Sequence, residues 1–209
     1  MTALKRSARD KLLDGALDVI RRQGYAATTV DDLCAAAGVT KGAFFHHFDS
    51  KEALGVAAVN HWSETTSAMF ATAAYHDPAD PLDRVLAYVR FRRTLLSGAP
   101  AEFSCVAGTM VQEVFDASPA IREACAASIF GHAATLQDDI AQAMQARGIR
   151  TDWTAASLAA HTQAVLQGAF ILAKARNDVS VAVESCDHLY RYIELLFRTD
   201  GLKEAGNDH

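Results

Sequence analysis

Apolar side chains recur every three or four residues along most of the chain, which is the spacing of an α-helix that buries one face. The first such stripe runs over residues 13–20. Ser7 precedes the stripe with Asp10 three residues later, as in a helix capping box, and Gly24 follows as a terminator. The pattern therefore predicts a first helix between Ser7 and Gly24.

Two shorter helices are predicted next. Thr29 begins a stripe that Gly38 ends, and Thr40 opens the following segment at once. Phe44 and Phe48 are four residues apart, so they share one face of that segment and should be buried. Two helices joined by such a tight turn are typical of a helix-turn-helix.

Six further helices are predicted from the same period and from the turn residues between segments. Their expected ranges are 51–75, 81–97, 104–114, 118–148, 152–177 and 180–200. No stretch shows the strict alternation of a half-buried strand. The sequence thus predicts an all-α fold of about nine helices.

The predicted helices divide into an N-terminal head and a larger body. Residues 1–52 would form the three-helix, helix-turn-helix DNA-binding domain, and residues 53–200 a helical ligand-binding and dimerisation domain. Residues 201–209 are expected to be a disordered tail.

Composition agrees with helices and limits the class of protein. Half of the 209 residues are hydrophobic, with only four Pro and twelve Gly. No apolar run approaches the roughly 20 residues of a membrane span, and residues 1–10 lack the apolar core of a signal peptide. We expect a soluble, cytoplasmic protein with no membrane partner.

Chemistry-bearing motifs are scarce. The four cysteines are widely spaced without a CxxC pair, which argues against disulfides and structural zinc in a cytosolic protein. There is no Gly-rich phosphate loop, HExxH or nucleophile elbow. We therefore expect no enzyme activity, no cofactor and no metal, although a hydrolase built from scattered His and Asp remains an alternative.

Charge is distributed unevenly. Residues 1–51 carry eight Lys and Arg against six Asp and Glu, whereas the remainder carries twelve against nineteen. Basic charge on the head and acidic charge on the body are typical of a small DNA-contacting head. On the third helix, Gly42 and Ala43 would let the backbone approach base edges, and Lys41, His46 and His47 could donate to bases or phosphates.

The head also resembles a known family. The segment GYAATTVDDLCAAAGVTKGAFFHHFDSKE, residues 24–52, is similar to the TetR/AcrR repressors, within a resemblance covering roughly residues 8–55. The resemblance implies a homodimer that binds operator double-stranded DNA. It implies DNA contacts at Thr29, Lys41, Gly42, Ala43, Phe45, His46, His47 and Lys51. Phe45 departs from the family, which usually has Tyr there and uses its hydroxyl on a phosphate.

The last two predicted helices are candidates for the dimer interface. The helix at 152–177 is apolar on two sides, so it should be buried on two sides. The helix at 180–200 has its own apolar stripe. A four-helix, isologous interface between two copies accounts for both, although these helices could also close a monomer core.

Large flexible and aromatic side chains, with a few polar groups, predict a cavity for an apolar or aromatic small molecule. An ordinary core is the alternative. The candidate residues are Trp62, Met69, Phe70, Phe91, Phe103, Met110, Phe115, Phe130, His132, Gln163 and Gln167.

The sequence predicts a ligand-responsive repressor that leaves its operator when a small molecule binds. Cys105 supports an alternative. If Ser104 caps the helix at 104–114, Cys105 lies in its first turn, where the helix N-terminus stabilises a thiolate. The protein would then be a thiol- or electrophile-sensing repressor, unless Cys105 is simply packed. An architectural DNA-binding protein without an effector is a further alternative.

Overall fold

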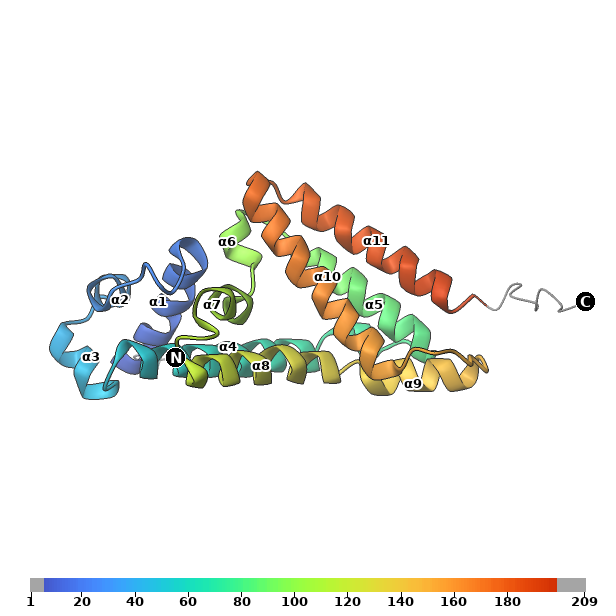
Figure 1. Ribbon diagram of the computed structural model, residues 1–209, viewed down its shortest axis with the longest axis horizontal. Coiled ribbons are helices and arrows are strands. Elements are labelled where there is room, and N and C mark those ends of the chain that lie inside the picture. Colours follow the sequence, from blue (N-terminus) through green and yellow to red (C-terminus); the bar gives the residue numbers. More distant parts are fainter. Residues whose placement is uncertain (1–5, 199–209) are drawn as a thin grey trace, which may run out of the picture.

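The structure is a computed structural model that describes residues 6–198, and the regular elements of that part of the chain are helical (Figure 1). The all-α prediction is therefore confirmed. The expected tail at 201–209 lies outside the described residues. The helices are α1 (Ala8–Gln23), α2 (Val30–Ala37), α3 (Lys41–His47), α4 (Lys51–Ala71), α5 (Pro81–Thr94), α6 (Pro100–Phe103), α7 (Val106–Val114), α8 (Pro119–Ala134), α9 (Gln137–Ala146), α10 (Ala155–Arg176) and α11 (Ser180–Leu196), with a 3-10 turn at Ala74–His76.

The head forms where the capping signals predict. Ser7 and Asp10 make a reciprocal capping box at the start of α1, and Thr29 makes another with Asp32 at the start of α2. Gly38 adopts the left-handed conformation, with φ 63°, that ends α2 and turns the chain into α3. The result is the compact helix-turn-helix at one end of the molecule in Figure 1.

The predicted helix at 118–148 is two helices. The chain bends at Thr135 and Leu136, between α8 and α9. The apolar stripe continues across the bend, but its two halves enter different cores. Ile121 and Cys125 pack in a core with α1–α4 and α7, whereas Ile140 packs in a second core with α5, α10 and α11.

The start of the helix at 104–114 also differs from the prediction. A short helix, α6, precedes it, and Ser104 is extended at the end of α6. Cys105, rather than Ser104, is the N-cap of α7, and its sulfur accepts a hydrogen bond from the backbone N–H of Gly108 at 3.4 Å. A thiol can replace a hydroxyl as a weak hydrogen-bond acceptor at an N-cap. Because Ser is the preferred residue at such positions, the sequence pattern indicated Ser104 instead of Cys105.

Helix α4 joins the head to the body. Its Gly55 allows close packing, because an added Cβ would lie 2.9 Å from the ring of Tyr25 and 3.2 Å from Met110 and Ile121. The head core therefore continues into α7 and α8, and the expected boundary at residue 52 falls in the first turn of α4.

Helices α10 and α11 run antiparallel along one edge of the body (Figure 1). In the described part of the chain, α10 is the helix long and apolar enough to meet a membrane-span criterion, with a mean hydropathy of 1.2. Its buried side includes Leu158, Leu166 and Phe170. Its other side leaves Ile171 and Leu172 exposed.

Candidate nucleic-acid interface and interior cavity

The third helix is held by one face and presents the other to solvent. Phe44 and Phe48 are buried in the head core, as predicted. Lys41, Gly42 and His46 are exposed on the surface of α3, while Ala43 and His47 are half-buried. The nearest atom to a Cβ added at Gly42 is the Thr40 hydroxyl oxygen, 3.7 Å away, so the protein itself leaves room there.

Phe45 is 54% exposed and meets Phe44 edge to face, with ring centroids 5.1 Å apart. An exposed Phe offers an apolar surface and no hydrogen bond. In a DNA groove, such a ring could contact a sugar or a thymine methyl group.

The charged and capping residues of the head already have partners within it. The ammonium of Lys41 lies 2.8 Å from a carboxylate oxygen of Asp31, which raises the pKa of Lys41. The hydroxyl of Thr29 donates to Asp32 at 2.7 Å. Among these residues Lys41 is the exposed cation. A DNA phosphate could replace Asp31 as its partner.

Lys51 has a structural role that its position in the sequence did not reveal. Its ammonium donates to the backbone oxygens of Tyr25 at 3.0 Å and Thr28 at 2.8 Å, and lies 4.4 Å from the centre of the Tyr25 ring. Lys51 thereby fixes the turn between α1 and α2. The backbone N–H groups at the start of α4 are then the better phosphate donors at this point.

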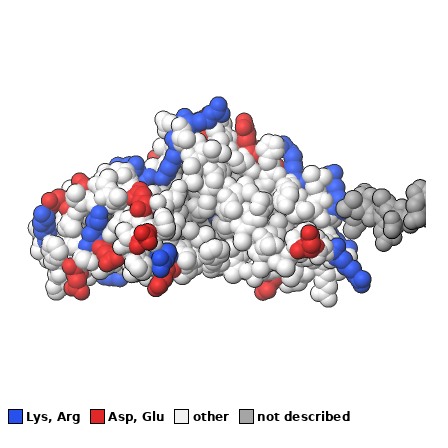
Figure 2. Space-filling view, in the orientation of Figure 1, with Lys and Arg blue, Asp and Glu red and all other residues white. Residues whose placement is uncertain are grey.

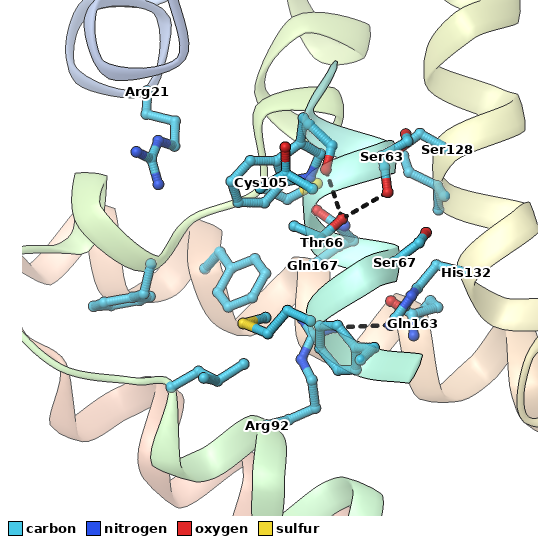
Figure 3. A pocket seen from close by; sticks show the side chains of 18 of the residues that line it. Arg21, Ser63, Thr66, Ser67, Arg92, Cys105, Ser128, His132, Gln163 and Gln167 are labelled. Carbon is cyan, nitrogen blue, oxygen red and sulfur yellow. Dashed lines mark hydrogen bonds between the residues drawn. The ribbon is translucent and has the colours of Figure 1, made fainter. Parts of the chain in front are cut away.

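A cavity of about 370 Å³ lies in the body, among α4, α5, α6, α8 and α10 (Figure 3). This volume lies within the range of small-molecule sites. Seven of the eleven residues that sequence analysis proposed for a cavity line it. They are Trp62, Met69, Phe70, Phe103, His132, Gln163 and Gln167.

The other four proposed residues lie outside the cavity lining. Met110 is buried in the core shared by head and body. Phe91 packs at the edge of the second core, against the rings of Phe70 and Tyr75. Phe115 and Phe130 are 58% and 65% exposed. Residue type and helical spacing could not separate these three environments.

Polar groups converge on one wall of the cavity. The hydroxyl of Tyr88 lies 2.9 Å from Nε2 of His132, and accepts hydrogen bonds from Gln163 at 2.8 Å and from Nη1 of Arg92 at 3.2 Å. The same Arg92 nitrogen lies 3.3 Å from Nε2 of His132. The Tyr88 hydroxyl and Nη1 of Arg92 are both donors to Nε2 of His132, which fits a neutral His132 whose Nε2 accepts a hydrogen bond. Arg92 and Tyr88 were not among the predicted residues, because an arginine near a helix end and a tyrosine on an apolar stripe have no distinctive spacing.

Cys105 lies in the cavity lining and is half-buried, at the N-terminus of α7. Cys34, Cys125 and Cys186 are buried, and burial raises the pKa of the Cys125 thiol to about 12. Cys105 is therefore the cysteine that a molecule in the cavity could reach. Residues 6–198 contain no group of three or more His, Cys, Asp or Glu side chains arranged to hold a metal.

Two family profiles match the chain, one over the head and the start of α4 and the other over most of the body. Residues 12–58 match "Bacterial regulatory proteins, tetR family". Residues 81–189, more than half of the chain, match "Tetracyclin repressor-like, C-terminal domain". The chain belongs to the TetR family. It is a DNA-binding transcriptional regulator with the family's helix-turn-helix head.

Known TetR-family regulators are similar to the chain over different lengths. The transcriptional repressor KstR2 of Rhodococcus jostii is 45% identical over 53 residues, which are 25% of this chain and 26% of KstR2. The repressor DhaR of Mycobacterium sp. is 26% identical over 166 residues, or 79% of this chain and 82% of DhaR. The high identity is thus confined to about a quarter of KstR2, and the body is related more distantly.

Solved structures share the fold over most of the chain. A TetR-family regulator from Agrobacterium tumefaciens has a TM-score of 0.76 at 22% identity, covering 88% of this chain and 96% of that one. The TetR-family regulator CifR, in a cysteine-substituted form complexed with 26-base-pair operator DNA, has a TM-score of 0.72 at 19% identity, covering 91% and 97%. These likenesses establish the architecture of the regulator and leave its ligand open.

The half-buried His132 of this TetR-family regulator predicts a pH-dependent stability. Burial, and to a lesser extent the positive Arg92, lowers the pKa of His132 to about 4. The unfolded chain takes up this proton near pH 6.5, so the free energy of unfolding should fall as the pH drops from about 6.5 to about 4. The expected loss is about 3 kcal/mol at pH 4. Urea unfolding of the wild type and of His132→Gln at several pH values measures it.

In that experiment the acid-induced loss should be smaller in His132→Gln by about the same 3 kcal/mol, because the other titrating groups are common to both proteins. The exposed His188 provides the matched control, as His188→Gln. Parallel pH profiles for the wild type and His132→Gln would contradict a His132 that is neutral in the folded protein.

Proposed function

We propose that this protein is a ligand-responsive transcriptional repressor. In this proposal a cytoplasmic homodimer binds operator DNA through α3 and releases it when a small molecule enters the cavity of the body. The observation that carries the proposal is a cavity that shares a helix with the DNA-binding head. A ligand that prefers one arrangement of that helix would shift the position of the head.

Helix α7 provides the connection. At its first turn Cys105 lies in the cavity wall, and Gly108 packs closely against Gln167, another lining residue. Near its last turn the carboxylate of Glu113 accepts a hydrogen bond from the backbone N–H of Ala26 at 2.7 Å, in the turn before α2. One short helix thus contacts both the cavity and the head.

Helix α4 provides a second connection between the same regions. Trp62, Met69 and Phe70 line the cavity from its C-terminal part. Its first turn carries Lys51, which fixes the head turn, and Glu52, which accepts a hydrogen bond from the Ser118 hydroxyl at the start of α8. A shift of α4 would therefore move the head relative to α8.

The dimer would form through the outer faces of α10 and α11. Four large apolar or aromatic side chains are exposed there: Ile171, Leu172, Tyr192 and Leu195. The rings of His161 on α10 and Tyr192 on α11 lie 5.3 Å apart, which joins the two helices into one surface. Figure 2 shows a broad region without charged side chains over the body, whereas Lys, Arg, Asp and Glu are mixed over the head. A twofold arrangement would place two heads on successive half-sites.

Operator release provides the test. An operator is first selected from random DNA, and a ligand is found by a thermal-stability screen of small molecules. Operator binding is then titrated by fluorescence anisotropy with and without the ligand, and ligand binding by calorimetry with and without the operator. The ligand should lower operator affinity by the same factor by which the operator lowers ligand affinity, since binding free energies are reciprocal. Equal ligand affinity with and without operator would overturn the proposal.

Glu113→Ala gives a sharper form of this test. It removes the bond from α7 to the head turn but leaves the cavity lining intact, so ligand affinity of the free protein should be retained while the reciprocal factor falls. Gln112→Ala is the matched control, because within residues 6–198 the Gln112 side chain bonds only to Gly108 of its own helix. If the reciprocal factor is unchanged in Glu113→Ala, the bond between Glu113 and Ala26 does not connect the cavity to the head. Helix α4 would then remain as the connection.

Cys105 favours a second candidate function, a repressor that responds to an oxidant or electrophile. Its thiol is in the cavity wall at the N-terminus of α7, where its sulfur accepts a hydrogen bond from the backbone N–H of Gly108 at 3.4 Å. Operator release that requires an electrophile and is lost in Cys105→Ser would favour this function over reversible ligand binding.

A further inference from the structure

One charge in the cavity wall has no counter-charge. Nη1 of Arg92 bonds to Tyr88 and approaches His132, and within residues 6–198 its Nε and Nη2 atoms have no hydrogen-bond partner and its guanidinium no carboxylate within ion-pair distance. The group lies against aromatic rings, with its central carbon 5.4 Å from the ring centre of Phe70 and 5.8 Å from that of Phe170. A half-buried cation among rings attracts an anion more strongly than a fully exposed cation does, because less water screens it.

The neighbouring cations differ from Arg92 in this respect. Arg21 also lines the cavity, but its three nitrogens donate to the backbone oxygens of Leu17 and Glu102 and to the carboxylate of Asp18. Arg93, the next residue after Arg92, is exposed and pairs with Asp187 at 2.8 Å. The acidic residue Glu102 does not pair with Arg92 either, because its carboxylate accepts a hydrogen bond from the backbone N–H of Ala99.

The polar groups around Arg92 do not neutralise it. Tyr88 and Gln163 are neutral side chains, and burial keeps His132 neutral by lowering its pKa to about 4. The polar cluster of Arg92, His132 and Gln163 in the cavity lining, with the buried Tyr88 behind it, therefore carries one positive charge. Figure 3 shows Arg92, His132 and Gln163 together at one end of the cavity, with Ser63, Thr66, Cys105 and Ser128 toward the other.

We propose that the effector is a small carboxylic acid with an apolar body, bound as its anion, and that the free Nε–Nη2 edge of Arg92 receives its carboxylate. This inference rests on the proposed function, because it names the chemical class of the ligand of the same cavity. A planar guanidinium and a carboxylate form two parallel hydrogen bonds, which is among the strongest pairings available to a protein.

The single charge favours a carboxylate over a phosphate. A phosphate monoester carries nearly two negative charges near neutral pH, and Arg92 supplies only one positive charge on this wall. A neutral ligand would leave the guanidinium without a counter-charge. A monoanion balances the charge, and the remaining lining accepts an apolar body.

The apolar body has a surface to match. The side chains of Trp62, Met69, Phe70, Phe103 and Phe170 line the cavity between its polar groups. Aromatic rings and a flexible Met adapt to either an aryl or an alkyl group. The preferred effector is therefore an aryl- or alkyl-carboxylate small enough for about 370 Å³.

Calorimetry on the full-length protein tests the proposal with matched probes. Phenylbutanoate, naphthylacetate, octanoate and dodecanoate are each compared with the corresponding primary amide. At least one carboxylate should bind about ten- to a hundred-fold more tightly than its amide, which is the range of a charge-assisted bidentate pair. In Arg92→Gln this preference should disappear, with the amide bound as in the wild type.

Arg93→Gln is the matched control and should keep the full preference, because Arg93 pairs with Asp187 away from the cavity. Arg92→Lys keeps the charge without the planar fork and should retain only part of the preference. If Arg92→Gln is poorly folded, Arg92→Lys and the wild-type comparison of acid with amide still decide the matter. Equal affinity for acid and amide in the wild type, a preference that survives in Arg92→Gln, or no carboxylate bound at millimolar concentration overturns the proposal.

Failure of this inference is distinguishable from failure of the proposed function. Carboxylates that bind through Arg92 without lowering operator affinity would support the ligand class and overturn ligand-driven release. A neutral molecule that binds the cavity and releases the operator would support the proposed function and overturn the ligand class.

Discussion

Gly42→Glu should abolish operator binding while leaving the fold intact. Gly42 lies on the exposed face of α3, where an added Cβ would make only an ordinary contact with the Thr40 hydroxyl oxygen, 3.7 Å away. A glutamate there would keep the helix backbone from the base edges and place a negative charge against the DNA. Like charges brought together across an interface cost several kcal/mol, so operator affinity should fall by at least about a hundred-fold. Fluorescence anisotropy with the selected operator measures the loss.

The thermal stability of Gly42→Glu should stay the same or rise, although its operator affinity falls. Glycine is about 1 kcal/mol less favourable than a good helix former inside a helix, so Gly42→Glu should not lower the thermal midpoint. Gly131→Glu is the matched control, since Gly131 is also an exposed helical glycine, on α8, and a Cβ added there would meet no atom within 4 Å. Operator affinity that survives in Gly42→Glu, or is lost equally in Gly131→Glu, would exclude α3 as the recognition helix.

The double substitution Leu172→Glu and Leu195→Glu should convert the proposed dimer into monomers. These side chains are 54% and 59% exposed in the single chain and lie on the outer faces of α10 and α11. Burying two carboxylates without partners in a twofold interface would cost several kcal/mol for each, and each occurs twice. Sedimentation should give the mass of one chain. Operator affinity should fall by about a hundred-fold or more, because two linked heads bind far more tightly than one.

Phe130→Glu provides the control for the dimer experiment. Phe130 is 65% exposed, also large and apolar, and lies on α8 outside the proposed interface. This variant should remain a dimer with full operator affinity. A dimeric double variant, or a monomeric Phe130→Glu, would place the interface elsewhere.

The head was predictable because its determinants are local. Ser7, Thr29 and Thr40 each accept a hydrogen bond from a backbone N–H three residues later, and Gly38 alone takes the left-handed turn between α2 and α3. Contacts of this kind are read directly from residue type and spacing. The same dense local pattern carried the resemblance to the TetR family.

The body was less predictable because one stripe can face different surroundings. The stripe through residues 121–140 predicts a buried face but does not tell that its halves enter separate cores, so the bend between α8 and α9 was missed. Met110, Phe115 and Phe130 are large apolar residues of the kind expected in a cavity. In the structure Met110 is in a core, whereas Phe115 and Phe130 are exposed.

The sequence by itself determined the helices of the head, the all-α class and the family, since these depend on caps, turns and periods within a few residues. Only the tertiary structure decided which side chains surround the cavity, that Lys51 is bound to the head turn, and that Arg92 faces the cavity without a counter-charge. The physical reason is that periodicity fixes the direction of a side chain relative to its own helix, whereas its environment depends on helices that are distant in sequence.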